Sequence, residues 1–138
     1  MSADSEVTFD LSEQPISAHA VSLFVSGFYR EAIRHEAQDL LNEIRERSGN
    51  DALDGQRLIQ AVLADRNPSL ALNDRENRQE QNLHASLRYL MLGVTAGVRN
   101  VYTHDVRGEV VREDAALWLV LMGQLREQIE RLEVVPSA

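Results

Sequence analysis

The sequence predicts an all-α fold, a helical bundle of about four to five helices. Apolar residues recur at steps of three and four along several stretches, which is the spacing of one helix face. No segment of useful length alternates apolar and polar residues as a half-buried strand would. The chain of 138 residues suits one domain with one core. We expect residues 1–15 to form a flexible acidic N-terminal segment and residues 16–135 to form the helical domain.

The first helical region is expected over residues 17–47. Its two apolar stripes are slightly rotated from one another and consist of Val21, Phe24, Val25 and Phe28, and of Ile33, Ala37, Leu40, Leu41 and Ile44. Gly27 lies within the first stripe and indicates a break or kink of the helix there, or a close approach of another helix. The run from Ser48 to Asp51 predicts a turn that ends the helix.

A short helix over residues 55–65 follows, and Asn67-Pro68 is expected to end it. The polar residues 74–82 are expected to lead, as a solvated segment, into a long amphipathic helix over residues 83–104. The expected apolar face of this long helix consists of Leu83, Leu87, Leu90, Met91, Val94, Val98 and Val101. Tyr89 on the same helix also fits a core position.

The last helix is expected after a loop or short extended segment over residues 105–112, with Asp114 as its N-cap. Its apolar residues follow an a/d heptad pattern and are Ala115, Trp118, Met122, Leu125, Ile129 and Leu132. This pattern is typical of a bundle seam or of a helix that binds a partner.

Composition narrows the classes of function. No apolar run reaches the ~20 residues that a membrane-spanning helix needs. The absence of cysteine excludes disulfides and thiolate zinc sites, and with the lack of a signal peptide it favours the cytoplasm. The net charge of -8 does not indicate a constitutive nucleic-acid binder, although a local basic site is compatible with it. All 14 cationic residues are Arg, which reflects either genomic base composition or bidentate phosphate recognition.

Three polar residues end the long helix and form the candidate site: Arg99, Asn100 and His104. On an ideal helix Asn100 and His104 lie about 40° apart, so Asn100 can orient the imidazole ring. Arg99 and His104 lie about 140° apart, so either the helix distorts here or the two groups meet across a second protomer. Small residues upstream, Gly93 and Gly97, would let another backbone come close.

These residue types suit cleavage of RNA without a metal ion. His104 can take the proton from a ribose 2′-OH or give one to the leaving 5′-oxygen. Arg99 can stabilise the charge that builds on the phosphate oxygens. The alternative is structural, with Asn100 capping the helix and His104 an ordinary residue at its end. Weaker candidates for RNA or phosphate binding are Tyr102, Arg107 and Arg112, the two arginines being otherwise solvated loop residues.

No metal or cofactor is predicted. His35 and Asp39 stand four residues apart, but no third ligand follows at a recognisable spacing, so they indicate a surface pair. The sequence also contains no Gly-rich loop that would cradle a phosphate.

The run Arg99-Asn100-Val101-Tyr102-Thr103-His104 resembles the signature of the HEPN superfamily (higher eukaryote and prokaryote nucleotide-binding domains). That signature is an Arg, a polar residue, a short spacer and a His at the end of a bundle helix. Further segments resemble a prokaryotic branch of uncharacterised and abortive-infection proteins. They are Leu23-Phe24, Gly27-x-Tyr29-x-Glu31-Ala32, Arg45-x-x-Ser48-Gly49, Asp54-Gly55-x-x-Leu58, Leu92-Gly93-Val94 and Gly97-x-Arg99-Asn100.

The resemblance implies a homodimeric HEPN-like bundle whose paired motifs form a cleft. It implies a metal-independent endoribonuclease acting on RNA, often in phage defence or beside an antitoxin or other regulatory protein. Arg99 and His104 match the catalytic pair, and Asn100 matches the polar residue. Val101 replaces a frequent Pro, and Val106 stands where toxins silenced by adenylylation have Tyr. Some relatives are non-catalytic, so a dimeric module that binds a nucleotide or a protein is the alternative.

Overall fold

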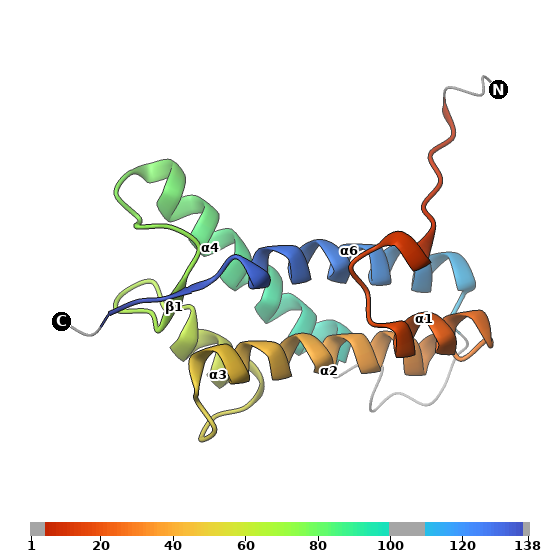
Figure 1. Ribbon diagram of the computed structural model, residues 1–138, viewed down its shortest axis with the longest axis horizontal. Helices are drawn as coiled ribbons and strands as arrows, with labels where there is room; N and C mark the ends of the chain where they lie inside the picture. Colours follow the sequence, from red (N-terminus) through yellow and green to blue (C-terminus); the bar gives the residue numbers. More distant parts are fainter. Residues whose placement is uncertain (1–4, 100–109, 137–138) are drawn as a thin grey trace.

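A computed structural model describes residues 5–99 and 110–136, and it confirms the all-α prediction. The helices of this described part are α1 (Ala18–Val25), α2 (Tyr29–Ser48), α3 (Gly55–Val62), α4 (Arg78–Gly93) and α6 (Arg112–Glu130). A 3-10 turn, η2 (Leu11–Glu13), precedes them, and a π-helical segment, η3 (Val94–Arg99), continues α4. Helices α2 and α6 lie side by side along the length of the molecule, and α4 crosses them (Figure 1).

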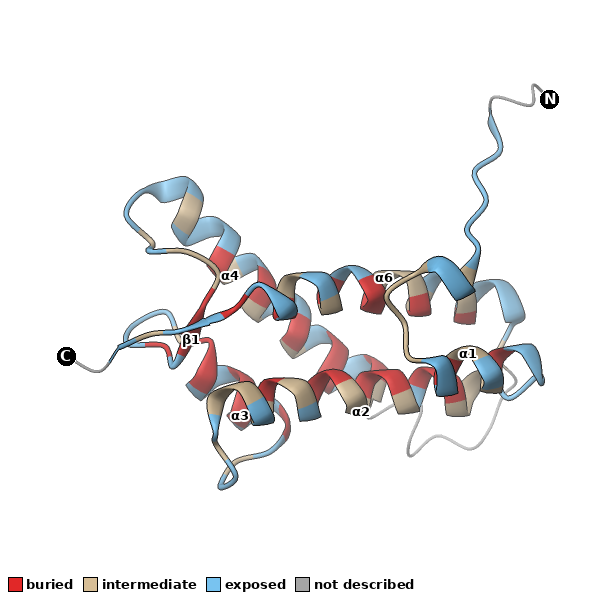
Figure 2. Cartoon of the chain, viewed as in Figure 1, coloured by how far each residue is buried: buried red, intermediate tan, exposed pale blue. Residues whose placement is uncertain are grey.

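The core lies between the inward faces of these helices (Figure 2). The second predicted stripe of α2 is confirmed, since all five of its residues are fully buried. The predicted heptad residues of the last helix are also buried, except that Trp118 is only partly covered. Helix α3 adds Leu58, Ile59 and Val62, and α4 adds Leu87 and Met91. One stripe per helix therefore builds a single apolar core.

Gly27 ends α1, so the first helical region is two helices rather than one kinked helix. Its φ of +87° is left-handed, and the Gly27 and Phe28 N–H groups donate to the Phe24 and Leu23 carbonyls at 3.0 and 2.8 Å. This is the Schellman arrangement, which favours glycine because a Cβ strains that backbone. An added Cβ would meet nothing within 4 Å, so close approach of another helix is not the reason for glycine. The break leaves Val25 and Phe28 exposed, although the pattern predicted them in the apolar stripe.

Several boundaries differ from the sequence predictions. Helix α4 begins at Arg78 rather than at residue 83, because Asn77 caps it by accepting the Glu80 N–H at 2.9 Å. Helix α6 begins at Arg112 with Val111 as its cap residue, so the prediction of Asp114 as N-cap was wrong. Asp114 lies instead in the first turn, where its negative charge favours the helix N-terminus.

Helix α3 ends at Val62, three residues earlier than predicted. The connection after it contains a two-residue strand, β1 (Leu70–Ala71), which pairs antiparallel with β2 (Glu133–Val134) near the C-terminus. Two-residue strands are too short for a period-2 pattern, which explains why the alternation of apolar and polar residues does not reveal them.

The predicted long helix is present over residues 83–99, but the last turn that the structure describes, η3, is wider than an α-helix. Thr95 is buried in this π-helical segment, and its hydroxyl donates to the Met91 carbonyl at 2.7 Å. Hydroxyls that bond back in this way bend helices, and π-helical turns occur often at functional sites. The predicted apolar face was too broad, because Leu83 and Leu90 are exposed. The separate prediction of a core position for Tyr89 was wrong, since Tyr89 is exposed as well.

No helix in the described ranges has the length and apolar content that a membrane crossing requires.

Candidate functional site

Arg99 is the candidate catalytic residue that the structure describes. It is the last residue of η3, and its side chain is 19% exposed. The Arg99 Nη1 group donates to the Gln38 Oε1 atom of α2 at 3.3 Å and lies 3.6 Å from the Asp54 Oδ1 atom. Asp54 is the N-cap residue of α3. The guanidinium is therefore held between three helical elements that are far apart in sequence.

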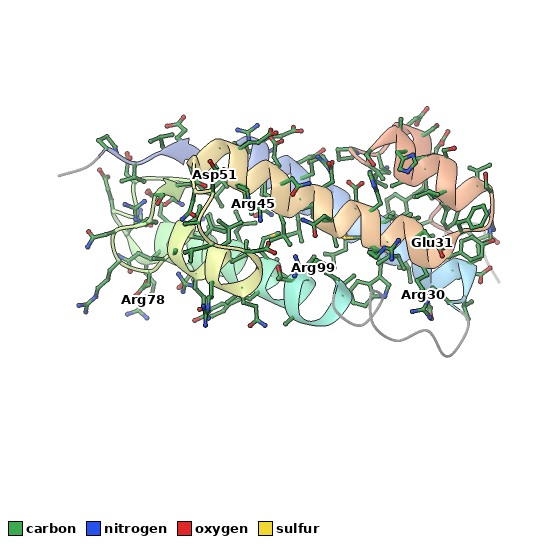
Figure 3. All side chains as sticks on the ribbon, turned by 90° about the horizontal axis from the view of Figure 1, so that it is seen from below. Arg30, Glu31, Arg45, Asp51, Arg78 and Arg99 are labelled. Atoms are coloured by element: carbon green, nitrogen blue, oxygen red, sulfur yellow. The ribbon has the colours of Figure 1, made fainter. Side chains whose placement is uncertain are left out.

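A second arginine shares the same carboxylate oxygen. The Arg45 Nη2 group lies 2.7 Å from Asp54 Oδ1, and the Arg45 Nη1 group donates to Asn42 Oδ1 at 2.9 Å. The Gln38 Nε2 group also donates to Asn42 Oδ1, at 3.1 Å. Gln38, Asn42, Arg45, Asp54 and Arg99 thus form a closed polar ring, which we call the two-arginine network. Figure 3 labels its two arginines.

The network keeps Asp54 ionised. The Gly55 N–H donates to its carboxylate at 2.8 Å and is the main cause that lowers the Asp54 pKa. Partial burial opposes this, but the positive charges of Arg99 and Arg45 lower the pKa further. Asp54 is therefore a carboxylate at neutral pH, and its charge is lost only as the pH falls below its ordinary pKa range.

Gly55 packs beside Arg99. Its φ of +59° is left-handed, and a Cβ on it would lie 3.5 Å from Arg99 Nη2 and 3.8 Å from Thr95 Cγ2. These separations are ordinary van der Waals contacts, so the space would admit a Cβ. The left-handed backbone, rather than the packing of Arg99, is therefore the reason for glycine at residue 55.

Among the described residues, the one further sequence candidate is Arg112, and it does not join the two-arginine network. Asn100, Tyr102, His104 and Arg107 lie outside those residues, so their predicted roles remain predictions. Arg112 begins α6, where its guanidinium lies over the Phe24 ring, 5.5 Å from the ring centroid. This contact is a cation–π interaction with α1.

Sequence reasoning did not single out Gln38, Asn42, Arg45 and Asp54 as site residues. A signal was nevertheless present for two of them, because Arg45 and Asp54-Gly55 belong to the segments that resemble the HEPN branch. That resemblance did not indicate which of its segments meet in space.

A second charged network is structural. Glu36 is completely buried, and its Oε1 atom accepts from Arg126 Nε and Nη2 at 3.1 and 2.6 Å. Its Oε2 atom accepts from the Ser17 N–H and hydroxyl at 3.2 and 2.8 Å. Arg126 also donates to Asp39 Oδ2 at 2.7 Å. Burial alone would lower the Arg126 pKa, but Glu36 and then Asp39 outweigh it and raise the pKa above its ordinary value. The network ties α1, α2 and α6 together.

The predicted His35–Asp39 pair has other partners. Asp39 binds Arg126, while the His35 ring contacts the His19 ring edge to face at a centroid distance of 4.6 Å. Over residues 5–99 and 110–136, no group of three His, Cys, Asp or Glu side chains could hold a metal ion.

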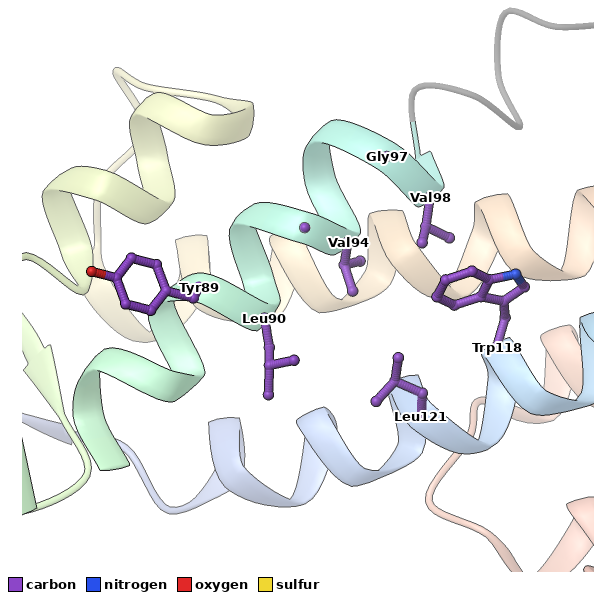
Figure 4. Close-up of a pocket in the computed structure, with 8 residues that line it drawn as sticks. Tyr89, Leu90, Val94, Gly97, Val98, Trp118 and Leu121 are labelled. Atoms are coloured by element: carbon purple, nitrogen blue, oxygen red, sulfur yellow. The ribbon is translucent and has the colours of Figure 1, made fainter. Parts of the chain in front are cut away.

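An apolar groove of about 390 Å³ lies between the α4–η3 helix and α6 (Figure 4). Its lining residues are Tyr89, Leu90, Gly93, Val94, Gly97, Val98, Trp118 and Leu121. Tyr89 is 65% exposed, and no described atom lies within 4 Å of a Cβ added to Gly93 or Gly97. Among the described residues, the groove is therefore apolar and partly exposed, with small residues along one wall.

Comparison with known proteins gives a family without an assigned activity. No curated protein and no solved structure matches the chain. Residues 11–129 match the family described as "Protein of unknown function (Hypoth_ymh)". This match covers all of α1 to α4 and most of α6. The chain belongs to the Hypoth_ymh family.

Proposed function

We propose that this protein is a metal-independent endoribonuclease of HEPN type. The observation that supports the proposal best is the position of Arg99. Its guanidinium is partly buried, held by Gln38 and placed beside an ionised carboxylate, so its donors are preorganised for an anion. It also ends a π-helical turn, and such turns occur often at functional sites.

The reaction proposed is an internal transesterification of RNA. The ribose 2′-oxygen attacks the adjacent phosphorus, the bond from phosphorus to the 5′-oxygen breaks, and a 2′,3′-cyclic phosphate and a 5′-hydroxyl result. His104 accepts the 2′-hydroxyl proton or donates a proton to the leaving oxygen. Arg99 stabilises the added negative charge on the phosphate oxygens, and Asn100 orients the imidazole. A homodimer would supply one histidine for each proton transfer.

The test is incubation of the purified protein with mixed cellular RNA in excess EDTA, beside the His104→Ala variant. We expect cleavage by the wild type alone, with 2′,3′-cyclic phosphate ends on the products. The EDTA removes the contribution of contaminating metal-dependent nucleases. Equal cleavage by both proteins would refute the role of His104, and absence of cleavage by the wild type would refute the proposed activity on this RNA pool.

The apolar groove favours a second candidate function, that of a non-catalytic dimeric binding module. Tyr89 and Leu90 on one wall of the groove are 65% and 41% exposed, and Trp118 and Leu121 line the other wall. An open apolar surface of this kind is typical of a protein interface. Met122, which the heptad pattern offers as an interface residue, is fully buried and belongs to the core.

We expect Leu121→Glu to convert a dimer to a monomer, because the introduced charge would be buried in the interface. Light scattering measures the mass of the wild type and of the variant. The matched control is Gln124→Glu, which adds the same charge at an exposed position of α6 that does not line the groove. A wild type that is monomeric at all concentrations would refute the dimer. Loss of dimer and of RNA cleavage together would favour the ribonuclease over the simple binding module.

A further inference from the structure

We propose that Arg45 and Arg99 together bind one phosphate group of the RNA, and that Asp54 occupies the phosphate position in the free protein. The identity of the ligand rests on the proposed function. The arrangement of two guanidinium groups on one carboxylate oxygen does not depend on it. The proposal adds to the site a residue, Arg45, that lies on a different helix from the catalytic motif.

The geometry matches the recognition of a phosphate. Arg45 Nη2 and Arg99 Nη1 lie 2.7 and 3.6 Å from the same oxygen, Asp54 Oδ1. A phosphate oxygen accepts hydrogen bonds from guanidinium donors as a carboxylate oxygen does. Asp54 is 65% exposed and the two arginines lie deeper. A ligand that approaches from solvent can therefore exchange with the carboxylate and reach both guanidinium groups.

The charge balance also favours an anion. Two guanidinium groups face one carboxylate, so the two-arginine network has an excess positive charge in a chain of net charge -8. In the Arg126 network the ratio is reversed, because one guanidinium faces the carboxylates of Glu36 and Asp39. The Arg126 network has no positive charge left for a ligand, whereas the two-arginine network does.

Neutral side chains hold both arginines in place. Asn42 accepts from Arg45, Gln38 accepts from Arg99, and Gln38 also donates to Asn42. These amides orient the guanidinium groups without cancelling their charge. The arrangement can therefore persist when the Asp54 carboxylate is displaced, so a phosphate would meet preorganised donors.

The first test measures affinity for a short fluorescein-labelled single-stranded RNA by anisotropy, with every variant built on His104→Ala so that the RNA stays intact. We expect Arg45→Gln to weaken binding about tenfold, as the loss of one charge-assisted contact would. The slope of log affinity against log salt should become shallower by about 0.7, the value for one phosphate contact on a single strand. Arg47→Gln is the control, because it removes the same charge two residues away and lies in an ion pair with Glu43.

The second test changes the carboxylate. Asp54→Asn preserves the capping oxygen of α3 and removes the charge that competes with phosphate. We expect it to tighten RNA binding more than Asp51→Asn, which removes the same charge from an exposed residue of the same loop. The proposal would be overturned if Asp54→Asn weakened RNA binding. It would also be overturned if Arg45→Gln changed the RNA affinity no more than Arg47→Gln does.

Failure of this inference can be separated from failure of the proposed function. A wild type that cleaves RNA in EDTA while Arg45→Gln binds RNA with unchanged affinity keeps the nuclease and rejects the phosphate site. Adenosine monophosphate that displaces the labelled RNA as effectively as unlabelled RNA does, at the same phosphate concentration, would show that the site recognises a single nucleotide phosphate and would overturn RNA as its preferred ligand. Competition by RNA alone supports the proposal.

Discussion

Arg126→Met is expected to lower the free energy of unfolding by about 3–5 kcal/mol, which is the usual cost of removing one partner of a buried ion pair while the other stays. The substitution retains an unbranched side chain but leaves the Glu36 carboxylate, which is fully buried, without its cation. Ser17 would still donate two hydrogen bonds to the carboxylate, yet they bring no positive charge. Urea denaturation followed by circular dichroism measures the loss.

Two variants make this prediction specific. Arg47→Met breaks the partly exposed i,i+4 pair with Glu43 and should change the free energy of unfolding by only about 0.5 kcal/mol. The double variant Glu36→Gln/Arg126→Met removes both buried charges of that pair and should be more stable than Arg126→Met alone. An Arg126→Met variant as stable as Arg47→Met, or a double variant less stable than Arg126→Met, would contradict the buried-charge argument.

The sequence predicts helices and helix ends correctly where a single local pattern determines them. The stripe from Ile33 to Ile44 has the period of a helix face, and burial of that face gives α2. Gly27 marks the break because the left-handed backbone there suits glycine. The start of α4 was also readable, since Asn77 stands three residues before Glu80, a spacing typical of a helix N-terminus. It was missed because the polar run hid the helical period.

Long-range placement is what the sequence could not predict. Asp54 and Arg99 are separated by α3 and α4, and nothing in their local patterns indicates that α3 brings the carboxylate to the end of η3. The π-helical turn likewise depends on packing and on the Thr95 hydroxyl, which a periodicity argument does not include. Tyr89 illustrates a second limit of sequence patterns. Its helical spacing fits a core position, but spacing does not reveal whether another element packs over the residue, and Tyr89 is exposed.

Arg99→Ala is expected to lower the kcat of RNA cleavage by about 10²–10³-fold, the usual effect of removing one preorganised donor to a developing oxyanion. The reason is that the charge on the phosphate oxygens rises in the transition state, so the guanidinium contributes more there than in the bound substrate. Arg99→Lys should recover only part of the rate, because an ammonium cannot reproduce the planar donors that Gln38 orients. Single-turnover cleavage in EDTA measures these rates.

Arg88→Ala is the matched control for this prediction. Arg88 lies on the same continuous helix, is partly buried and donates to the Leu63 carbonyl at 3.2 Å, so its removal tests for a general loss of arginine packing. Equal cleavage rates of the Arg99→Ala and Arg88→Ala variants would contradict a catalytic role of Arg99.

The kinetic constants also test whether the two arginines of the network bind the same phosphate. Arg45→Gln should lower kcat as well as raise KM, because Arg45 contacts the phosphate group that Arg99 stabilises in the transition state. An unchanged kcat for Arg45→Gln, beside a lowered kcat for Arg99→Ala, would mean that the two guanidinium groups act on different phosphates.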